Sequence, residues 1–308
     1  MPAKSSPLDI VPTSLLKCCV DIFAPAISTM ANLSFTEGRF PTVFKTAQVL
    51  PLLKKKGLDR SQLANYRPIS NLNTISKIIE RLMLSRLRPQ IMNSPNFSSL
   101  QSAYRSGHST ETALLSILDG LYQAIDNKQT AVLVSLDLSA AFDTISHRML
   151  LHRLKVEFGV SGLALAWVES YLCDRRQFVK IGKHQSASVP CDLGVPQGSV
   201  LGPLLFVAYV SPVSDIVTSA GFGFHQYADD SQIYFATRPN SVSEDLEALR
   251  SCTERLRCWF LINGLMLNPD KSEALFVGTH QQRHAVASVQ TVPVAGADLP
   301  IALELESQ

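Results

Sequence analysis

Residues 224–236 read FHQYADDSQIYFA, which places Asp229 and Asp230 side by side between two runs of strand-forming composition. Adjacent Asp residues in a turn have an ordinary explanation, because their short polar side chains bond to turn backbone and tolerate the left-handed region. A turn selected for stability alone more often contains Asn-Gly or Asp-Gly and has no need of two like charges. The apolar flanks predict a buried hairpin with both carboxylates at its tip, where a bound cation would offset their repulsion.

A third carboxylate ends another strand-like run, the apolar and β-branched TAVLVSLDL at residues 130–138. If this strand lies beside the hairpin, Asp137 converges with Asp229, although 92 residues separate the two along the chain. Three converging carboxylates with no Cys or His partner form an oxygen-only site, which suits Mg²⁺. Two such ions about 4 Å apart would activate an attacking hydroxyl and stabilise a leaving pyrophosphate, as in phosphoryl transfer.

Basic residues are concentrated in the first third of the chain. Residues 39–105 contain twelve Lys or Arg against two acids, Asp59 and Glu80, for a net charge of about +10, whereas the whole chain carries only +2. This segment indicates a polyanionic partner. A solvated helix face with outward-pointing Lys and Arg is the alternative explanation.

Composition bounds the class of protein. With 46% hydrophobic and 18% charged residues in 308, the chain is globular rather than disordered. The start lacks the features of a secretory signal, and the longest apolar run, residues 200–210, is too short for a membrane span. The six cysteines form no C-x-x-C pair, which favours reduced thiols. We therefore expect an intracellular protein without a membrane segment.

Hydrophobic periodicity predicts interleaved helices and strands. A strand, a basic loop and an extended segment are expected over residues 49–70, two antiparallel strands over 176–193, and a further strand near 274–277. This interleaving indicates an α/β or α+β fold with a mixed, mostly antiparallel sheet. Helices are predicted over residues 8–33, 74–91, 110–125, 145–157, 163–172, 199–217 and 242–263.

Six sequence blocks, taken in order and spacing, resemble the reverse transcriptases of non-LTR retrotransposons, closest to the jockey and Rex type of LINE elements. The resemblance covers roughly residues 15–280. A lone YADD is weak evidence, whereas six blocks in family order are specific. The blocks are NYRPIS (65–70), QSAYRSGHSTETALL (101–115), LDLSAAFD (136–143), GVPQGSVLGP (194–203), YADD (227–230) and LMLNPDKSE (265–273).

The resemblance implies an α+β right-hand polymerase fold whose mixed, mostly antiparallel palm sheet packs on helices. An N-terminal helical extension (1–34) would precede the fingers (35–130) and the palm (131–280), with fingers elements interleaved at 144–190. The Val, Gly and Pro spacing in residues 281–308 is unlike a helical bundle. We therefore expect only a truncated start of the thumb, or a tail, in that segment.

The implied function is RNA-directed DNA polymerase activity by two-metal nucleotidyl transfer. The family implies two Mg²⁺ ions, with Mn²⁺ as a substitute, and template RNA, primer DNA and deoxynucleoside triphosphates as partners. No stable protein partner is expected, and the site of action would be the nucleus, the cytoplasm or both. The alternative is a catalytically inactive, thumbless remnant that only binds nucleic acid.

The resemblance also implies roles for residues around the predicted cation site. Asp137 and Asp229 would bind the metal ions, with Asp230 in a supporting role. Lys271 matches a lysine that protonates the leaving pyrophosphate as general acid. A solvated lysine after a Pro-Asp turn is the alternative for that position.

A second set of residues would contact the incoming nucleotide. Phe142 matches an aromatic gate that clashes with a ribose 2′-hydroxyl, although an ordinary core ring is the alternative. Gln197 and Gly198 match a loop beside the nucleotide and template, or are simply a turn. Lys54 and Arg67 fall where the fingers grip the triphosphate, and the register among Lys54, Lys55 and Lys56 stays open.

Overall fold

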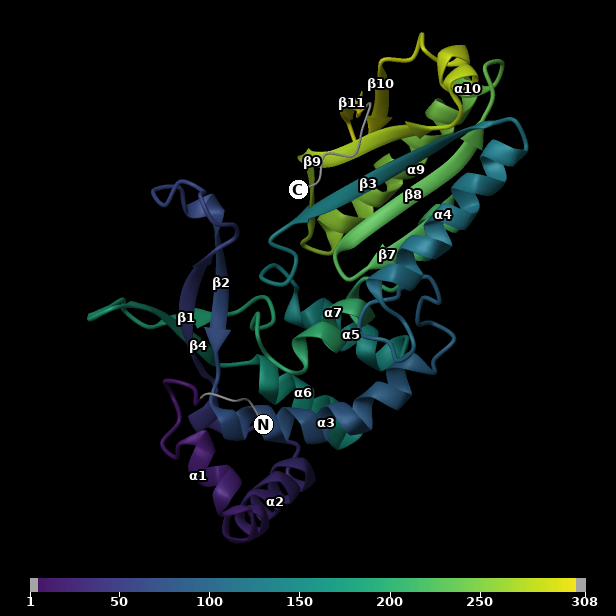
Figure 1. Cartoon of the computed structure of the whole chain (residues 1–308). Helices are drawn as coiled ribbons and strands as arrows, with labels where there is room; N and C mark the ends of the chain where they lie inside the picture. The colour runs from purple at the N-terminus through teal and green to yellow at the C-terminus, as the bar shows by residue number, and fades with distance from the viewer. Residues whose placement is uncertain (1–4, 303–308) are drawn as a thin grey trace. The chain divides into compact units, whose positions relative to one another are not determined.

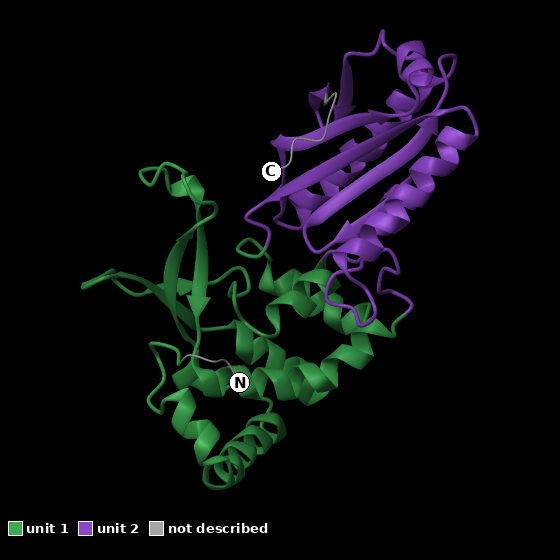
Figure 2. Ribbon diagram, viewed as in Figure 1, with its two compact units in different colours: residues 1–94, 142–209 green, residues 95–141, 210–308 purple. Residues whose placement is uncertain are grey.

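The computed structural model describes residues 5–302, which fall into two compact units, each discontinuous along the chain (Figure 2). Unit 1 comprises residues 1–94 and 142–209, and unit 2 comprises residues 95–141 and 210–308. Each unit contains one mixed β-sheet together with helices. The expected α+β class with mixed sheets is therefore confirmed.

The sheet of unit 1 has the order β2-β1-β4-β5, and β6 also pairs with β4. It is mixed, because β1 is antiparallel to β2 and parallel to β4. The strand, loop and extended segment expected over residues 49–70 correspond to β1, its following loop and β2. The strands are β1 (Thr46–Leu53), β2 (Tyr66–Asn71), β4 (Arg175–Ile181), β5 (His184–Gln185) and β6 (Val189–Cys191).

Helices and aromatic rings build the core of unit 1. The Phe40 ring lies edge-on to the rings of Trp167 and Tyr171, with centroids 5.3 Å and 5.1 Å away. The Trp167 indole donates to Ser34 Oγ at 2.8 Å, so its buried N–H is satisfied. The helices are α1 (Thr13–Cys18), α2 (Val20–Thr36), α3 (Thr74–Met92), α5 (His147–Val156), α6 (Gly162–Leu172) and α7 (Gly202–Tyr209), with single 3₁₀ turns at Thr42–Phe44 and Leu63–Asn65.

The sheet of unit 2 has the order β10-β11-β9-β3-β8-β7, and only the β11–β9 pairing is parallel. Figure 1 shows α4 and α9 running alongside this sheet. The elements are α4 (Thr110–Asp126), β3 (Thr130–Ser139), α8 (Val213–Thr218), β7 (Gly223–Tyr227), β8 (Asp230–Thr237), α9 (Val242–Ile262), β9 (Met266–Val277), α10 (His280–Ala285), β10 (Thr291–Val294) and β11 (Ala297–Ala302).

Amphipathic helix α4 anchors one side of this sheet. A capping box between Ser109 and Thr112 satisfies backbone donors at its first turn. Ile117 and Leu121 of α4 are buried in one cluster with Ala131 of β3. The apolar stripe of the helix therefore packs on the strand that carries Asp137, which fixes that strand in place.

Two predicted helices are each divided into two. The helix expected over residues 8–33 consists of α1 and α2, separated at Cys19, whose backbone leaves the helical region at φ −115° and ψ 41°. The prediction of one continuous helix over residues 199–217 was also wrong, because this segment forms two helices, α7 and α8. Pro212 offers no N–H to continue the first helix.

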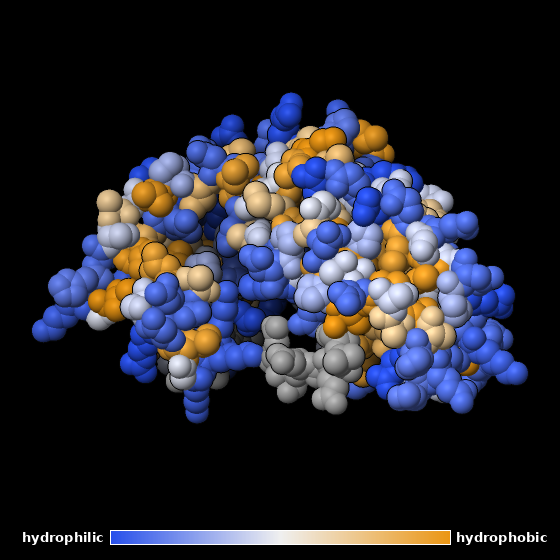
Figure 3. Space-filling view, turned by 90° about the horizontal axis from the view of Figure 1, so that it is seen from above, coloured by the Kyte–Doolittle hydropathy of each residue, from blue (hydrophilic) through white to orange (hydrophobic). Residues whose placement is uncertain are grey.

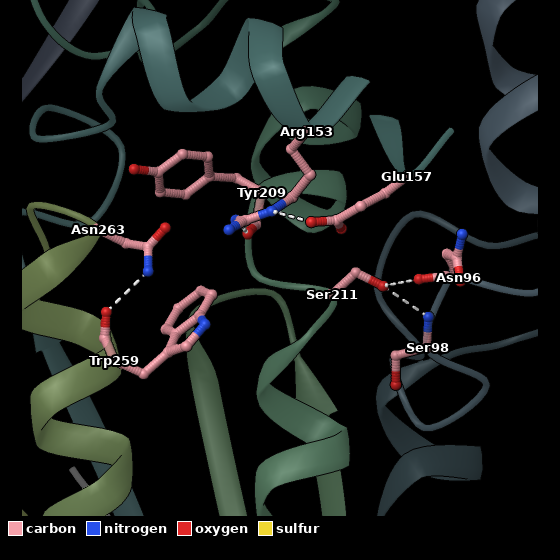
Figure 4. A network of polar contacts seen from close by, with 8 residues as sticks. All are labelled: Asn96, Ser98, Arg153, Glu157, Tyr209, Ser211, Trp259 and Asn263. Atoms are coloured by element: carbon pink, nitrogen blue, oxygen red, sulfur yellow. Dashed lines mark hydrogen bonds and ion pairs between the residues drawn. The ribbon is translucent and has the colours of Figure 1, made fainter. Parts of the chain in front are cut away.

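Polar contacts around that break hold the backbone (Figure 4). Ser211 Oγ donates to Asn96 O at 2.7 Å and accepts from Ser98 N at 2.8 Å. At the end of α9, Asn263 Nδ2 donates to Trp259 O at 2.8 Å. Ser211 thus links the break to the backbone of residues 96 and 98, and Asn263 adds a second hydrogen bond to a carbonyl in the last turn of α9.

Hydrophobic residues reach the visible surface at several separate places among hydrophilic ones (Figure 3). Within residues 5–302, no helix combines the length and the apolar character needed to cross a bilayer.

Candidate active site

The hairpin predicted around YADD is present in unit 2. Strands β7 and β8 pair antiparallel, and Tyr227 lies opposite Asp230. Ala228 and Asp229 therefore form a two-residue turn. Ala228 has φ +57°, a left-handed conformation that alanine adopts only at a cost in free energy. The tip of the turn thus carries Asp229, and Asp230 begins the outgoing strand.

Strand β3 lies beside β8, which is the condition under which the sequence analysis expected Asp137 to converge with Asp229. Leu136 pairs with Ser231 in this antiparallel register. Asp137 is the next residue of β3, and Asp230 immediately precedes Ser231, so the two carboxylates stand on neighbouring strands at one end of the sheet. The structure therefore brings together Asp137, Asp229 and Asp230 from two segments that are distant along the chain.

The three carboxylates interact electrostatically. Asp230 is exposed at the surface, yet the surrounding protein removes enough solvent to raise the pKa of its carboxyl, and the charges of Asp229 and Asp137 raise that pKa further. The charges of Asp229 and Asp137 therefore disfavour ionisation of Asp230. A divalent cation would reverse this effect, because its charge favours the ionised forms.

The donor set fits a hard cation, since three mutually repelling carboxylates supply only oxygen ligands. Across residues 5–302, however, no three His, Cys, Asp or Glu side chains are already arranged as a metal site. The prediction that Asp137, Asp229 and Asp230 are metal ligands therefore stays a prediction, supported by their proximity and their chemistry.

Strand β9 brings Lys271 to the same place. Lys271 Nζ lies 3.9 Å from Asp137 Oδ2, and the lysine side chain is 54% exposed. The pairing of β3 with β9 is irregular between Ser135 and Asp137, where the register shifts. That irregularity leaves Lys271 out of the regular ladder, beside the carboxylate and open to solvent.

Asn268 is a neighbour of Asp137 that the sequence analysis missed. Its Nδ2 donates to Asp137 Oδ2 at 3.2 Å. Ser272 Oγ accepts from Asp137 N at 3.3 Å and donates to Asn268 O at 2.8 Å. These contacts orient the carboxylate from β9. The signal was available, because Asn268 lies in the same LNPDKSE block as Lys271.

The loop with Gln197 and Gly198 belongs to unit 1, where it is tied to β2. Ser70 N donates to Gln197 O at 2.8 Å. Gly198 has φ +112°, and a Cβ atom at that position would lie 2.9 Å from Ser70 O. Only glycine fits such a backbone and such an approach. The loop conformation is therefore specified by the sequence.

Glu80 fixes the other end of this loop, and the sequence analysis had counted it only as an acid in the basic segment. Its side chain is fully buried. Glu80 Oε2 accepts from Val200 N at 2.8 Å and from Leu201 N at 3.2 Å, just before α7. Ser76 Oγ donates to Glu80 Oε1 at 3.0 Å, and the Tyr171 hydroxyl donates to Oε2 at 3.2 Å. Burial raises the pKa of Tyr171, and the Glu80 charge raises it further.

Glu80 could have been found from helical spacing. The buried face of α3 includes Ser76, Glu80, Met83 and Leu87. A carboxylate at that spacing falls on the core side of the helix, where a charged group needs hydrogen-bond donors.

The other predicted nucleotide contacts also lie in unit 1. Phe142 is half-buried and its ring stacks on Phe206 with centroids 4.5 Å apart, as a core ring does. Arg67 on β2 is exposed, as are Lys54, Lys55 and Lys56. Lys54 Nζ donates to Ala64 O at 2.7 Å. The gate and triphosphate roles stay predictions.

The candidate residues thus fall into two sets by unit. Asp137, Asp229, Asp230 and Lys271 lie in unit 2. The predicted nucleotide-binding set lies in unit 1 and consists of Lys54, Arg67, Phe142, Gln197 and Gly198.

The family model described as "Reverse transcriptase (RNA-dependent DNA polymerase)" matches residues 53–293. Among curated proteins, the "RNA-directed DNA polymerase from mobile element jockey" of Drosophila melanogaster is 29% identical over 278 residues, which cover 88% of this chain and 30% of the relative. The "Probable RNA-directed DNA polymerase from transposon BS" of the same species is equally similar, with the same coverage. The chain therefore spans about a third of the length of these relatives.

Solved structures show the same fold. Apo telomerase from Candida tropicalis superimposes with a TM-score of 0.55 over 90% of this chain and 52% of that chain, at 11% identity. The likeness extends to a second telomerase structure from this organism, in complex with a fragment of telomeric RNA, at a TM-score of 0.53.

Proposed function

Because the chain belongs to the reverse transcriptase family, we propose that it is the polymerase region of a jockey-like non-LTR retrotransposon and extends a DNA primer on an RNA template. The observation that carries this proposal is the meeting of Asp137, Asp229 and Asp230 at one end of the unit 2 sheet. Such a constellation suits phosphoryl transfer, where positioning and charge do most of the work.

Asp137 and Asp229 would hold two Mg²⁺ ions, or Mn²⁺ in their place, and Asp230 would support them. When bound, such ions neutralise phosphate charge and lower the pKa of the attacking 3′-hydroxyl. Asn268 Nδ2 holds one oxygen of Asp137 and thereby fixes the orientation of that ligand. Lys271 Nζ, which lies 3.9 Å from the same carboxylate, would give a proton to the departing pyrophosphate oxygen as the bond from the α-phosphorus breaks.

Unit 1 supplies the residues proposed to bind the incoming deoxynucleotide. Arg67 and one of Lys54, Lys55 and Lys56 would contact its triphosphate, while Gln197 and Gly198 would line the nucleotide and template side. Phe142 would exclude the 2′-hydroxyl of a ribonucleotide. Eleven of the twelve basic residues between 39 and 105 belong to unit 1, and although Lys45 is buried, the exposed members of this set could attract polyanionic substrates.

In polymerase terms, we assign residues 1–34 to an N-terminal helical extension and 35–130 to the fingers. Residues 131–280 form the palm, with fingers elements at 144–190, and residues 281–308 begin a thumb or form a tail. The protein would act in the nucleus, the cytoplasm or both, without a stable protein partner.

Primer extension tests the proposal directly. The full chain is incubated with a labelled DNA primer on an RNA template, deoxynucleoside triphosphates and Mg²⁺. Extension should require Mg²⁺, and Asp229→Asn should abolish it while keeping the size of the side chain. Asp119→Asn, an exposed carboxylate on α4, is the matched control and should retain activity. Metal-independent extension, or equal activity of Asp229→Asn and wild type, would refute the proposal.

A second function, nucleic-acid binding without turnover, is favoured by the charge of about +10 over residues 39–105. It predicts salt-sensitive RNA binding that survives Asp137→Ala, together with no extension by the wild-type chain. Loss of all RNA binding in a folded Asp137→Ala variant would eliminate it.

A further inference from the structure

Gln101 lies against the turn that carries the carboxylates, within unit 2. It is 1% exposed and forms a parallel β-bridge with Gln226, two residues before Ala228. Gln226 N donates to Leu100 O at 3.0 Å, and Ser102 N donates to Gln226 O at 2.9 Å. The segment around Gln101 therefore adds a short strand-like contact to the free edge of β7.

The Gln101 side chain bonds to both polar backbone groups of one turn residue. Its Oε1 accepts from Ala228 N at 2.9 Å, and its Nε2 donates to Ala228 O at 3.3 Å. Oε1 also accepts from Ala103 N at 2.9 Å, so the amide itself is held in place. A single side-chain amide thus provides hydrogen-bond partners for both the N–H and the C=O of Ala228.

Ala228 needs such a constraint. It has φ +57°, although it is not glycine, and it is only 7% exposed, which leaves little access for water to satisfy its backbone. Non-glycine residues persist in this conformation only where their surroundings over-determine it. Asp229 and Asp230 follow directly, so the backbone of Ala228 sets the direction in which both carboxylates leave the turn.

We propose that Gln101 is a positioning residue that clamps Ala228 in the left-handed conformation and thereby orients Asp229 and Asp230 for cation binding. The inference rests on the proposed function where it concerns catalysis, because it names a determinant of the same site. The clamp itself is a property of the folded chain and is measurable without any substrate.

Gln101→Met tests the clamp, because methionine nearly preserves the volume of the side chain and removes both hydrogen-bonding groups. Amide hydrogen exchange in a peptide covering residues 224–236 should accelerate by about tenfold or more at the turn. Mn²⁺ affinity, measured by electron paramagnetic resonance titration, should fall by a similar factor of about ten. Primer extension should then require more Mg²⁺, with a smaller change in the KM for nucleotide.

Asn263→Ala is the matched control, because Asn263 is also buried in unit 2 and also donates an amide hydrogen bond to a backbone carbonyl. It should lower thermal stability without changing exchange at the turn or Mn²⁺ affinity. If Gln101→Met does not fold, Gln101→Asn serves instead. Its amide is one methylene too short to reach Ala228 while the residue stays polar.

Rescue separates positioning from simple packing. Glycine adopts positive φ at little cost, so Gln101→Met combined with Ala228→Gly should recover part of the lost Mn²⁺ affinity. A side chain that only filled space would show no such recovery.

The possible outcomes are distinct from those for the proposed function. Unchanged turn exchange in folded Gln101→Met overturns the clamp, whether or not the chain polymerises. Faster exchange with unchanged Mn²⁺ affinity overturns its role in orienting the carboxylates. Conversely, a wild-type chain that never extends a primer contradicts the proposed function, and the exchange measurement still decides on Gln101.

Discussion

Removing the buried carboxylate of Glu80 should destabilise unit 1 strongly, and the size of the effect depends on what replaces it. Glu80→Met leaves the N–H groups of Val200 and Leu201 without their acceptor in a fully buried place. Each buried unsatisfied donor costs about 1–3 kcal/mol, so the two together cost about 2–6 kcal/mol. The hydroxyls of Ser76 and Tyr171 can rotate toward other partners and are left out of this sum.

Glu80→Gln is the matched comparison. The glutamine oxygen can take the place of Oε2, which accepts from both backbone N–H groups, and its NH₂ group can donate to Ser76 Oγ in place of the present contact. What is lost is the charge assistance, which makes hydrogen bonds to charged groups stronger than neutral ones by about 1 kcal/mol. Glu80→Gln should therefore cost about 1–2 kcal/mol, clearly less than Glu80→Met.

Urea denaturation followed by circular dichroism measures both variants against wild type. The midpoint for Glu80→Gln should fall below that of wild type by about 1 M or less, and the midpoint for Glu80→Met should fall further. A Glu80→Met midpoint within error of wild type would mean that the hydrogen bonds from Val200 and Leu201 to the carboxylate do not stabilise the segment before α7. In that case the account of how the loop with Gln197 and Gly198 is fixed would be wrong.

Gly198→Ala should lower the free energy of unfolding of unit 1 by about 1–3 kcal/mol, because the new Cβ would lie against the Ser70 carbonyl and the residue has a positive φ. Calorimetry that finds no loss of stability would contradict this close approach. Burial lowers the pKa of His147, whose Nε2 lies 2.7 Å from Gly194 O. The folded state then binds fewer protons than the unfolded state, so stability is full above pH ~6.5 and declines as the pH falls below that value. His147→Gln should flatten that decline in urea midpoints measured from pH 7.5 to 5, and an unaltered pH profile would count against it. Phe142→Val should raise incorporation of ribonucleotides relative to deoxynucleotides in primer extension; unchanged discrimination would favour the plain core role that its stacking on Phe206 suggests.

Local patterns predicted much of the fold. The helices over residues 74–91, 110–125 and 242–263 agree with α3, α4 and α9 to within a residue or two, because each has a continuous apolar stripe and clear end signals. Helices α7 and α8 were joined in error, since the apolar run around Pro212 continues through a break that depends on Ser211 and its distant partners. Hydrophobic periodicity indicates which residues are buried, but it does not indicate hydrogen bonds to residues far away along the chain.

The candidate site divides in the same way. Local signals located Asp137 at a strand end and Asp229 and Asp230 in a hairpin turn. Their convergence was expected on condition that the two strands pair, and the family resemblance implied the same set. Asn268, Glu80 and Gln101 were not recognised, because each acts on a partner 120 or more residues away along the chain. For Asn268 that partner is the Asp137 carboxylate, and for Glu80 and Gln101 it is a backbone group. Helical spacing puts Glu80 on the buried side of α3, but the partners of all three residues are set by tertiary packing, which residue spacing does not encode.

The interleaving of the two units has a consequence for synthesis of the chain. Unit 1 has all its residues once Tyr209 has been made, whereas strand β3 of unit 2 must wait for β8 and then for β9, which ends at Val277. During that interval the apolar strand leading to Asp137 has neither neighbour, and unpaired strand edges of this kind are prone to aggregate. Ribosome-bound chains stopped before residue 230 should therefore depend on chaperones far more than chains released after residue 280.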